Sequence, residues 1–191
     1  MFARTPRLLL RPGWQEDAPA LHAALADESI VRNLSRAPWP YERAHAEDFI
    51  ALEPDPLLPR FLVFSRTQGR PLLVGGCGLG KGGEDGTVEL GYWIARPYWG
   101  LGFATEAARA VVRMARAAGI RRLTGSHFVD NPASGRVMRK IGFRPTGELV
   151  RRFSAARGEE ALAALYEDSG EDDMRADISA DLYEDAAILA A

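Results

Sequence analysis

The sequence predicts an α/β domain with a mixed β-sheet, on three observations. Apolar strand-like runs alternate with helices of clear 3.6-residue periodicity in the second half of the chain. The middle of the chain contains apolar runs separated by short turns, which is typical of an antiparallel meander. A chain of 191 residues, of which 47% are hydrophobic, is long enough to bury one continuous core.

The first half of the chain is expected to contain three strands and two helices. Strands are placed where short apolar runs end at proline or glycine, and helices where apolar residues recur three or four positions apart. The strands are predicted over residues 7–11, 61–64 and 71–75, and the helices over residues 18–26 and 42–52.

The second half is expected to contain a βαβα series and a final hairpin. Asp85-Gly86 is a hairpin signal that leads into a strand. The most regular helix carries an apolar stripe and ends before Gly119, and Asn131-Pro132 has the signature of a second helix start. These elements are strands 88–94 and 123–129, helices 104–118 and 132–141, and a hairpin of residues 149–154 and 161–166 across Arg157-Gly158.

Composition excludes several classes of protein. No apolar run approaches the roughly 20 residues that cross a bilayer, and the N-terminus lacks the apolar segment of a secretory signal. One cysteine cannot form an internal disulfide, and with only three histidines a structural metal site is not expected. A net charge of −2 argues against a dedicated nucleic-acid-binding protein. We therefore expect a soluble cytoplasmic protein with no metal, no nucleic-acid partner and no membrane association.

The charge is unevenly distributed along the chain. Residues 167–191 contain nine acidic residues and one basic residue, which leaves a net charge of +6 on residues 1–166. We predict a globular domain over residues 1–166 and an acidic C-terminal tail over residues 167–191. The tail is interpreted either as a solvated terminus or as a segment that competes for a basic site or a partner.

Two glycine-rich segments are candidates for binding phosphate. In the first, residues 75–83, a G-x-x-x-x-G-K pattern ends at Lys81, but Gly82 stands where a magnesium-binding Ser or Thr would be. A nucleotide loop also leads into a helix, whereas a turn and a strand follow here. We therefore interpret residues 75–83 as a strand and a flexible turn, and P-loop-like nucleotide binding is disfavoured.

The second segment, residues 99–107, follows a predicted strand and opens the most regular helix. Gly100 and Gly102 allow the backbone to approach a ligand closely, and N–H groups at a helix start point outward at the positive end of the helix dipole. A pyrophosphate is the natural occupant of such a turn. An ordinary strand-to-helix turn is the alternative.

Two motifs resemble those of the GNAT N-acetyltransferases, above all the branch named for ribosomal-protein N-terminal acetyltransferases. Residues 92–107 resemble the acetyl-coenzyme A motif, although Trp99 stands where Arg or Gln commonly begins it. About 40 residues further on, residues 131–134 and 139–143 resemble the second motif of that branch, an N-x-x-S helix that ends in K-x-G-F. The looser similarity extends from about Arg7 to Tyr166.

The resemblance implies a mixed, mostly antiparallel central sheet with flanking helices, in which one parallel strand pair splays apart to admit the pantetheine arm of acetyl-coenzyme A. It also implies that the pyrophosphate rests on the N–H groups of residues 100–105, with basic residues of the second helix nearby. The implied cofactor-binding residues are Tyr92, Trp93, Ile94, Trp99, Gly100, Leu101, Gly102, Phe103, Ala104, Thr105, Asn131, Ser134, Arg139 and Lys140.

Three residues are the candidates for catalysis. An ammonium group must lose a proton before it attacks a thioester, and Glu89 is the candidate base. The alternative is that Glu89 is simply a strand residue that faces outward. The resemblance places Asn131 near the cofactor arm and Ser134 beside the departing thiolate. Met138 occupies the position of a tyrosine in many family members, and a thioether cannot donate a proton. A backbone N–H near Ile94 would face the acyl oxygen.

The first hypothesis is an acetyl-CoA-dependent N-acetyltransferase that acts on a primary amine, of a protein N-terminus or a small molecule, by direct attack in a ternary complex. The alternative is a non-catalytic acyl-CoA-binding regulatory module of the same fold. Cys77 lacks a neighbouring histidine and is interpreted as a buried residue rather than a nucleophile. His127 is a candidate pocket residue, as are Trp14, Trp39 and Tyr41 on the acceptor side. A monomer or a homodimer is expected.

Overall fold

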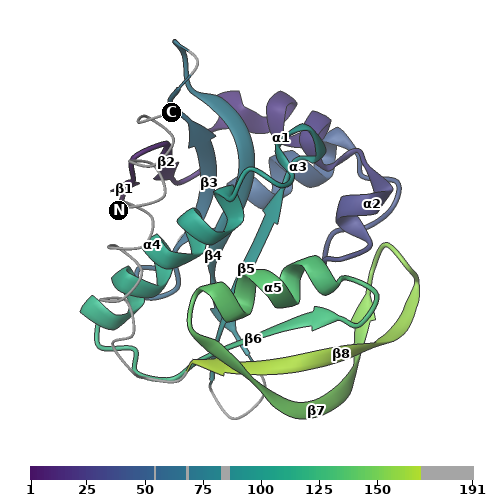
Figure 1. The fold of residues 1–191 in the computed structure, drawn as a ribbon. Helices are drawn as coiled ribbons and strands as arrows, with labels where there is room; N and C mark the ends of the chain where they lie inside the picture. The colour runs from purple at the N-terminus through teal and green to yellow at the C-terminus, as the bar shows by residue number, and fades with distance from the viewer. Residues whose placement is uncertain (54, 68, 83–86, 169–191) are drawn as a thin grey trace, which may run out of the picture.

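The computed structural model describes residues 1–53, 55–67, 69–82 and 87–168, and helices cover both faces of its mixed sheet (Figure 1). Within these residues eight strands form one sheet in the order β1-β2-β3-β4-β5-β6-β8-β7. The strands are β1 (Ala3–Arg4), β2 (Leu8–Arg11), β3 (Arg60–Ser65), β4 (Leu72–Lys81), β5 (Val88–Ile94), β6 (Leu123–Phe128), β7 (Phe143–Ser154) and β8 (Glu159–Asp168). The helices are α1 (Ala18–Leu25), α2 (Glu28–Val31), α3 (Arg43–Ala51), α4 (Phe103–Ala117) and α5 (Pro132–Lys140), with 3-10 turns η1 (Gln15–Asp17) and η2 (Arg96–Tyr98).

The structure confirms the mixed, mostly antiparallel sheet, and it extends several of the predicted elements. Residues 75–81 continue β4 instead of forming a turn, because they pair with β5 along its full length. β7 begins at Phe143, before the predicted hairpin strand, and β1 and α2 were not predicted. The predicted Asp85-Gly86 turn lies outside the described residues.

The last strand extends past the predicted boundary between domain and tail. Glu167 and Asp168 belong to β8, where they pair with β6 and β7. The carboxylate of Asp168 is buried and accepts from Arg116 Nη2 at 2.7 Å. The folded part of the chain therefore includes the first two residues that sequence analysis assigned to the acidic tail.

The strongest amphipathic helix packs as its pattern predicts. The apolar stripe of α4 is buried in the main core, where the helix contacts β4 and β5. α4 and α5 lie on one face of the sheet, and α1 and α3 lie on the other (Figure 1). Side chains of β5 alternate between these faces: Leu90 and Tyr92 join the α4 side, and Trp93 joins the α1–α3 side.

The sheet opens between β5 and β6, the parallel pair within its described strands (Figure 1). The two strands pair only at Val88–Leu123 and Glu89–Thr124, although β5 continues to Ile94. Beyond these two pairs the strands diverge, and this divergence connects one face of the sheet with the other.

The hydrogen-bonding phase of β5 directs main-chain groups into this opening. In an antiparallel ladder, residue pairs alternate between hydrogen-bonded and non-hydrogen-bonded. Ala95 N–H donates to Val74 O at 2.9 Å, which makes Ile94 and Tyr92 members of non-hydrogen-bonded pairs with β4. Their N–H and C=O groups therefore point away from β4, toward the gap beside β6.

Candidate active site

A cavity of about 1030 Å³ occupies the opening between β5 and β6. The turn before α4 lines it at one end, and β5, β6 and α5 line its middle. On the opposite face it is lined by residues of α1 and α3 and by residues 33–38. The cavity is therefore lined by residues from both faces of the sheet.

The turn at the start of α4 forms an anion-binding geometry. Gly100 and Gly102 have φ values of +79° and +77°, a region that favours glycine. The first backbone bond of the helix runs from Glu106 N–H to Gly102 O at 3.1 Å. Among the described residues, no acceptor is hydrogen-bonded to the N–H groups of residues 100–105. These donors at the positive end of a 15-residue helix form a site suited to a phosphate or pyrophosphate.

A tryptophan in the segment between β5 and this turn is hydrogen-bonded back to the end of β5. Trp99 Nε1 donates to Ile94 O at 2.6 Å, so the indole occupies a main-chain acceptor at the end of β5. Trp99, Phe103 and Ala104 all line the cavity. Trp99 stands where Arg or Gln is usual in the family, and here it ties this segment to the end of β5.

An ionic anchor ties the glycine turn to the N-terminal strands. Glu106 accepts from Thr5 Oγ1 at 2.5 Å, from Arg7 N at 3.0 Å and from Arg7 Nε at 2.7 Å. The same guanidinium donates from Nη1 to Leu101 O at 2.9 Å. Burial by itself raises the pKa of the Glu106 carboxyl, but the hydrogen bonds from Thr5 and Arg7 outweigh it and hold the pKa below its ordinary value. Leu101 is half-exposed and is not among the residues that line the cavity, so the role predicted for it concerns its main-chain N–H alone.

The basic residues of α5 divide between two faces of the helix. Arg136 and Lys140, four residues apart and therefore on one side of the helix, line the cavity. Arg139 does not, because its guanidinium lies 5.9 Å from the centre of the Tyr166 ring on β8. The structure therefore favours Arg136 over Arg139 as a partner of Lys140.

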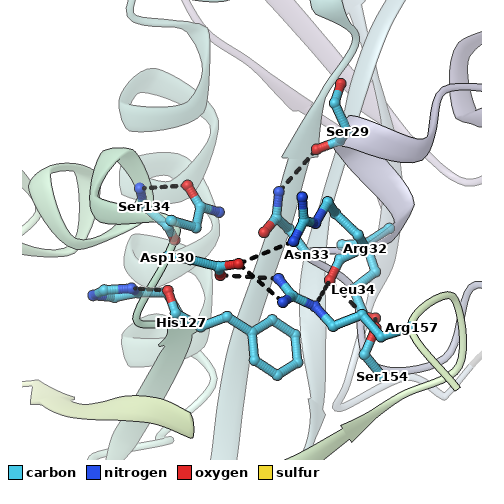
Figure 2. A network of polar contacts seen from close by, with 11 residues as sticks. Ser29, Arg32, Asn33, Leu34, His127, Asp130, Ser134, Ser154 and Arg157 are labelled. Atoms are coloured by element: carbon cyan, nitrogen blue, oxygen red, sulfur yellow. Dashed lines mark hydrogen bonds and ion pairs between the residues drawn. The ribbon is translucent and has the colours of Figure 1, made fainter. Parts of the chain in front are cut away.

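Two hydroxyl groups, one from the start of α5 and one from β5, meet on the α4–α5 face of the sheet. Asn131 caps the helix, with its Oδ1 accepting from Ser134 N–H at 3.4 Å (Figure 2). Tyr92 reaches across from β5, and its hydroxyl lies 2.8 Å from Ser134 Oγ and donates to Ser134 O at 3.0 Å. Burial raises the pKa of Tyr92 above its ordinary value, so its hydroxyl stays protonated at neutral pH. Three predicted site residues thus meet at one point of the cavity.

Glu89 lies on the opposite face and has two partners that sequence analysis missed. Its Oε1 accepts from Ser126 Oγ at 2.7 Å, and both of its oxygens accept from Arg152 Nη1, at 2.9 and 2.7 Å. All three side chains line the cavity. Arg152 lies on β7, 63 positions away, and nothing in its sequence context marks it; the pairing exists only because β6, β8 and β7 follow β5 in the sheet.

A polar network holds the segment that follows α2, which lines the cavity on the α1–α3 face of the sheet (Figure 2). Asp130 accepts hydrogen bonds from both Nη groups of Arg157, each at 2.9 Å, and from Arg32 Nη2 at 3.1 Å. Arg157 Nε donates to Arg32 O at 2.8 Å, and Ser154 Oγ donates to Leu34 O at 3.1 Å. The Arg157 guanidinium holds the pKa of Asp130 below its usual range. The network joins the chain after α2 to the β7–β8 turn and to the residue before the α5 cap.

The remaining candidates differ in whether they line the cavity. Burial raises the pKa of the Cys77 thiol well above its usual range, which leaves the protonated, non-nucleophilic form. His127 lines the cavity, but its Nδ1 is bonded to Phe128 O at 2.8 Å. Trp14 and Trp39 are half-exposed and do not line the cavity, whereas Tyr41 does. Burial, and then the charge of Asp48, raise the pKa of Tyr41 to about 12.

No group of three or more His, Cys, Asp or Glu side chains in the described part of the chain is arranged to hold a metal ion. None of the helices formed by these residues is long and apolar enough to cross a membrane.

The site thus combines a parallel strand pair that splays beside a cavity with an N–H-lined turn at a helix start. The family model of the acetyltransferase (GNAT) domain matches residues 7–144, and the chain belongs to this family. The protein is thus an acetyltransferase of the GNAT superfamily, as the two sequence motifs indicated.

Individual relatives agree with this assignment. The chain is 30% identical over 167 residues to N-acetyltransferase YoaA of Bacillus subtilis (strain 168), with 85% of this chain and 93% of the relative covered. It is 27% identical over 160 residues to N-acetyltransferase p20 of Bacillus licheniformis, with 81% and 88% covered.

Solved structures share the fold. A GNAT-family acetyltransferase from Bacillus anthracis superposes with a TM-score of 0.73 at 23% identity, over 87% of this chain and 97% of that one. The ribosomal L7/L12 α-N-protein acetyltransferase RimL, solved in complex with coenzyme A, superposes with a TM-score of 0.70 at 20% identity, again over 87% and 97%.

Proposed function

We propose that the protein transfers an acetyl group from acetyl-coenzyme A to a primary amine by direct attack within a ternary complex. The observation that carries the proposal is the opening between β5 and β6, with Glu89 on one face of the sheet and the Ser134–Tyr92 hydroxyl pair on the other. Coenzyme A bound to RimL, which has the same fold, supports acetyl-coenzyme A as the donor.

The residues around the cavity fit this donor. The N–H groups of residues 100–105 would hold its pyrophosphate, and Arg136 and Lys140 would neutralise phosphate charge. The main-chain groups of Tyr92, directed into the gap, would hydrogen-bond the amide groups of the pantetheine arm. When bound, the donor supplies a thioester, whose acyl carbon is open to attack by an uncharged amine.

Glu89 is the group placed to make the acceptor amine reactive. A protonated amine has no lone pair, so a proton must leave before the N–C bond forms. Glu89 Oε2 accepts one hydrogen bond, from Arg152, and a carboxylate oxygen has a second lone pair that the ammonium group, or a water between them, can use. Ser126 and Arg152 keep the carboxylate fixed toward the cavity, so that the proton is taken from a defined direction.

The opposite face serves the departing sulfur. As the N–C bond forms, the C–S bond breaks, and negative charge passes from the acyl oxygen to the sulfur. The N–H of Ile94, which points into the gap, would donate a hydrogen bond to the acyl oxygen. Tyr92 Oη lies 2.8 Å from Ser134 Oγ, and either hydroxyl can donate in this contact. When Tyr92 donates to Oγ, the serine hydroxyl hydrogen is available to the sulfur.

Two measurements test the proposal. Acetyl-coenzyme A should raise the melting temperature, and ATP with magnesium should not; the reverse result would reject the assignment. Initial rates of thiol release with peptides, polyamines and aminoglycosides should give intersecting double-reciprocal plots, and enzyme incubated with donor alone should carry no acetyl group on Cys77. Donor binding without thiol release in the presence of any amine would instead favour the non-catalytic module.

A further inference from the structure

The glycine-rich part of β4 is explained by packing at three of its positions. A Cβ atom at Gly75 would lie 2.3 Å from Trp93 O, and one at Gly76 would lie 2.4 Å from Trp93 Nε1. At Gly78 it would lie 2.6 Å from Pro59 O. Backbone atoms and the half-buried indole of Trp93 leave no room for side chains there, so the fold itself requires these glycines.

The same reasoning fails at Gly80 on β4 and at Gly91 on β5. A Cβ atom at either position would meet no atom of the described residues within 4 Å, and neither residue has a positive φ. A glycine inside a strand costs roughly 0.5–1 kcal/mol relative to alanine, and it often marks a place where a ligand approaches the backbone. Neither sterics nor backbone conformation therefore accounts for these two glycines.

Both glycines lie directly beside Glu89 on the acceptor face. Gly80 is its cross-strand partner, and Gly91 follows it by two residues on the same side of β5. Both line the cavity, and the remaining sides of the carboxylate are occupied by Ser126 and Arg152. As far as the described part of the chain extends, the space next to the candidate base is thus free of side chains in two directions.

The boundary of this space is apolar on one side. Trp93 points to the same face as Glu89 and Gly91, and its indole covers Gly76 and lines the cavity. A substituent that lies over Gly91 would therefore reach an aromatic wall. A substituent over Gly80 would lie on bare main chain.

We infer that Gly80 and Gly91 form the floor of the acceptor site and determine its specificity: the floor admits a primary amine on a branched carbon, with one substituent over each glycine. This inference rests on the proposed function, because it takes Glu89 as the point that the amine reaches. An amine on an unbranched CH₂ group needs only one of the two spaces. The site therefore distinguishes isomeric amines by the branching of the carbon next to nitrogen.

The test compares two isomers, 1-phenylethylamine and 2-phenylethylamine, which contain the same atoms and differ in this branching. In the wild-type protein, kcat/KM for the branched isomer should equal or exceed that for the linear isomer. Gly80→Ala and Gly91→Ala should each lower kcat/KM for the branched isomer at least tenfold and change that for the linear isomer less than threefold. Val129→Ile, which adds one carbon at a half-exposed position outside the cavity, should change neither.

Binding separates this inference from the proposed function. Calorimetric titration of both isomers into protein saturated with coenzyme A should show the same selective loss for the branched isomer, whether or not acetyl transfer occurs. Equal losses for the two isomers, or full retention of the branched one in both alanine variants, would overturn the inference. Failure of wild-type protein to bind acetyl-coenzyme A would instead count against the proposed function.

Discussion

Glu106→Gln tests whether the anchor beneath the glycine turn organises the donor site. The carboxylate is largely buried and accepts three hydrogen bonds, two of them at Oε1 and one from Arg7 Nε at Oε2. A glutamine amide must turn its NH₂ group toward a donor at one of these positions, so at least one charge-assisted bond is lost. Such a bond contributes roughly 1.5–3 kcal/mol.

The exposure of the Arg7 and Glu106 side chains sets the size of the expected loss in the free energy of unfolding. Because the Arg7 side chain is 44% exposed, water screens part of the interaction, and we expect a loss of about 2 kcal/mol in the free energy of unfolding. For a chain of this size that corresponds to a fall of roughly 4–8 °C in Tm. Glu47→Gln is the matched control, since the Glu47–Arg43 pair is exposed and should contribute little. Both variants can be measured by urea unfolding at pH 7.

The stabilisation that Glu106 provides should depend on pH. The folded-state pKa of Glu106 is lowered, so its stabilisation is fully present above the ordinary glutamate value of 4.5 and is lost as pH falls through the folded-state pKa. The difference between wild type and Glu106→Gln should therefore be large at pH 7 and should shrink below pH 4.5. The variant should also bind acetyl-coenzyme A several-fold more weakly, since Arg7 holds Leu101 O in the same turn. An equal stability difference at both pH values, or unchanged affinity, would refute the reasoning.

Three further predictions concern the site and its support. Glu89→Gln should lower kcat by roughly 10²–10⁴ with little change in the Kd of acetyl-coenzyme A, because the amide keeps the shape of the side chain but cannot take a proton, and it loses the bonds accepted at one of the two oxygens; wild-type turnover that is flat from pH 6 to 9 would contradict the base role. Tyr92→Phe removes the partner 2.8 Å from Ser134 Oγ and should cost about 1 kcal/mol in unfolding free energy, with a fall in kcat in stopped-flow thiol release; an unchanged kcat would show that the serine needs no orientation. Gly75→Ala should destabilise the protein by roughly 1–3 kcal/mol because it drives a Cβ against Trp93 O, while Gly80→Ala should leave the urea midpoint unchanged or higher; equal midpoints would argue against the packing account.

Local chemistry accounts for what could be predicted from the sequence. The stripe of α4, the Asn131 cap and the strand at residues 88–94 depend on neighbours within one turn or one strand, so their patterns suffice. The glycines at 100 and 102 are read in the same way, since positive φ is a property of single residues. β4 was cut short because its glycines resemble a turn, and only pairing with β5 makes them a strand.

Other features of the site depend on strand order, which no short pattern encodes. Arg152 reaches Glu89 because β7 and β8 close the sheet beside β6. The exclusion of Arg139 and Leu101 from the cavity follows from the direction each residue faces after packing.

The sequence by itself determined the family, the helix that opens on an N–H-lined turn and the identity of the candidate acid–base groups, because these are written in contiguous residues. The tertiary structure alone decided that Glu89 and Ser134 face opposite sides of one opening, that Tyr92 contacts Ser134, and that Gly80 and Gly91 leave space beside the carboxylate. The physical reason is that alternation along a strand specifies which residues share a face, whereas the strands on either side decide what that face meets.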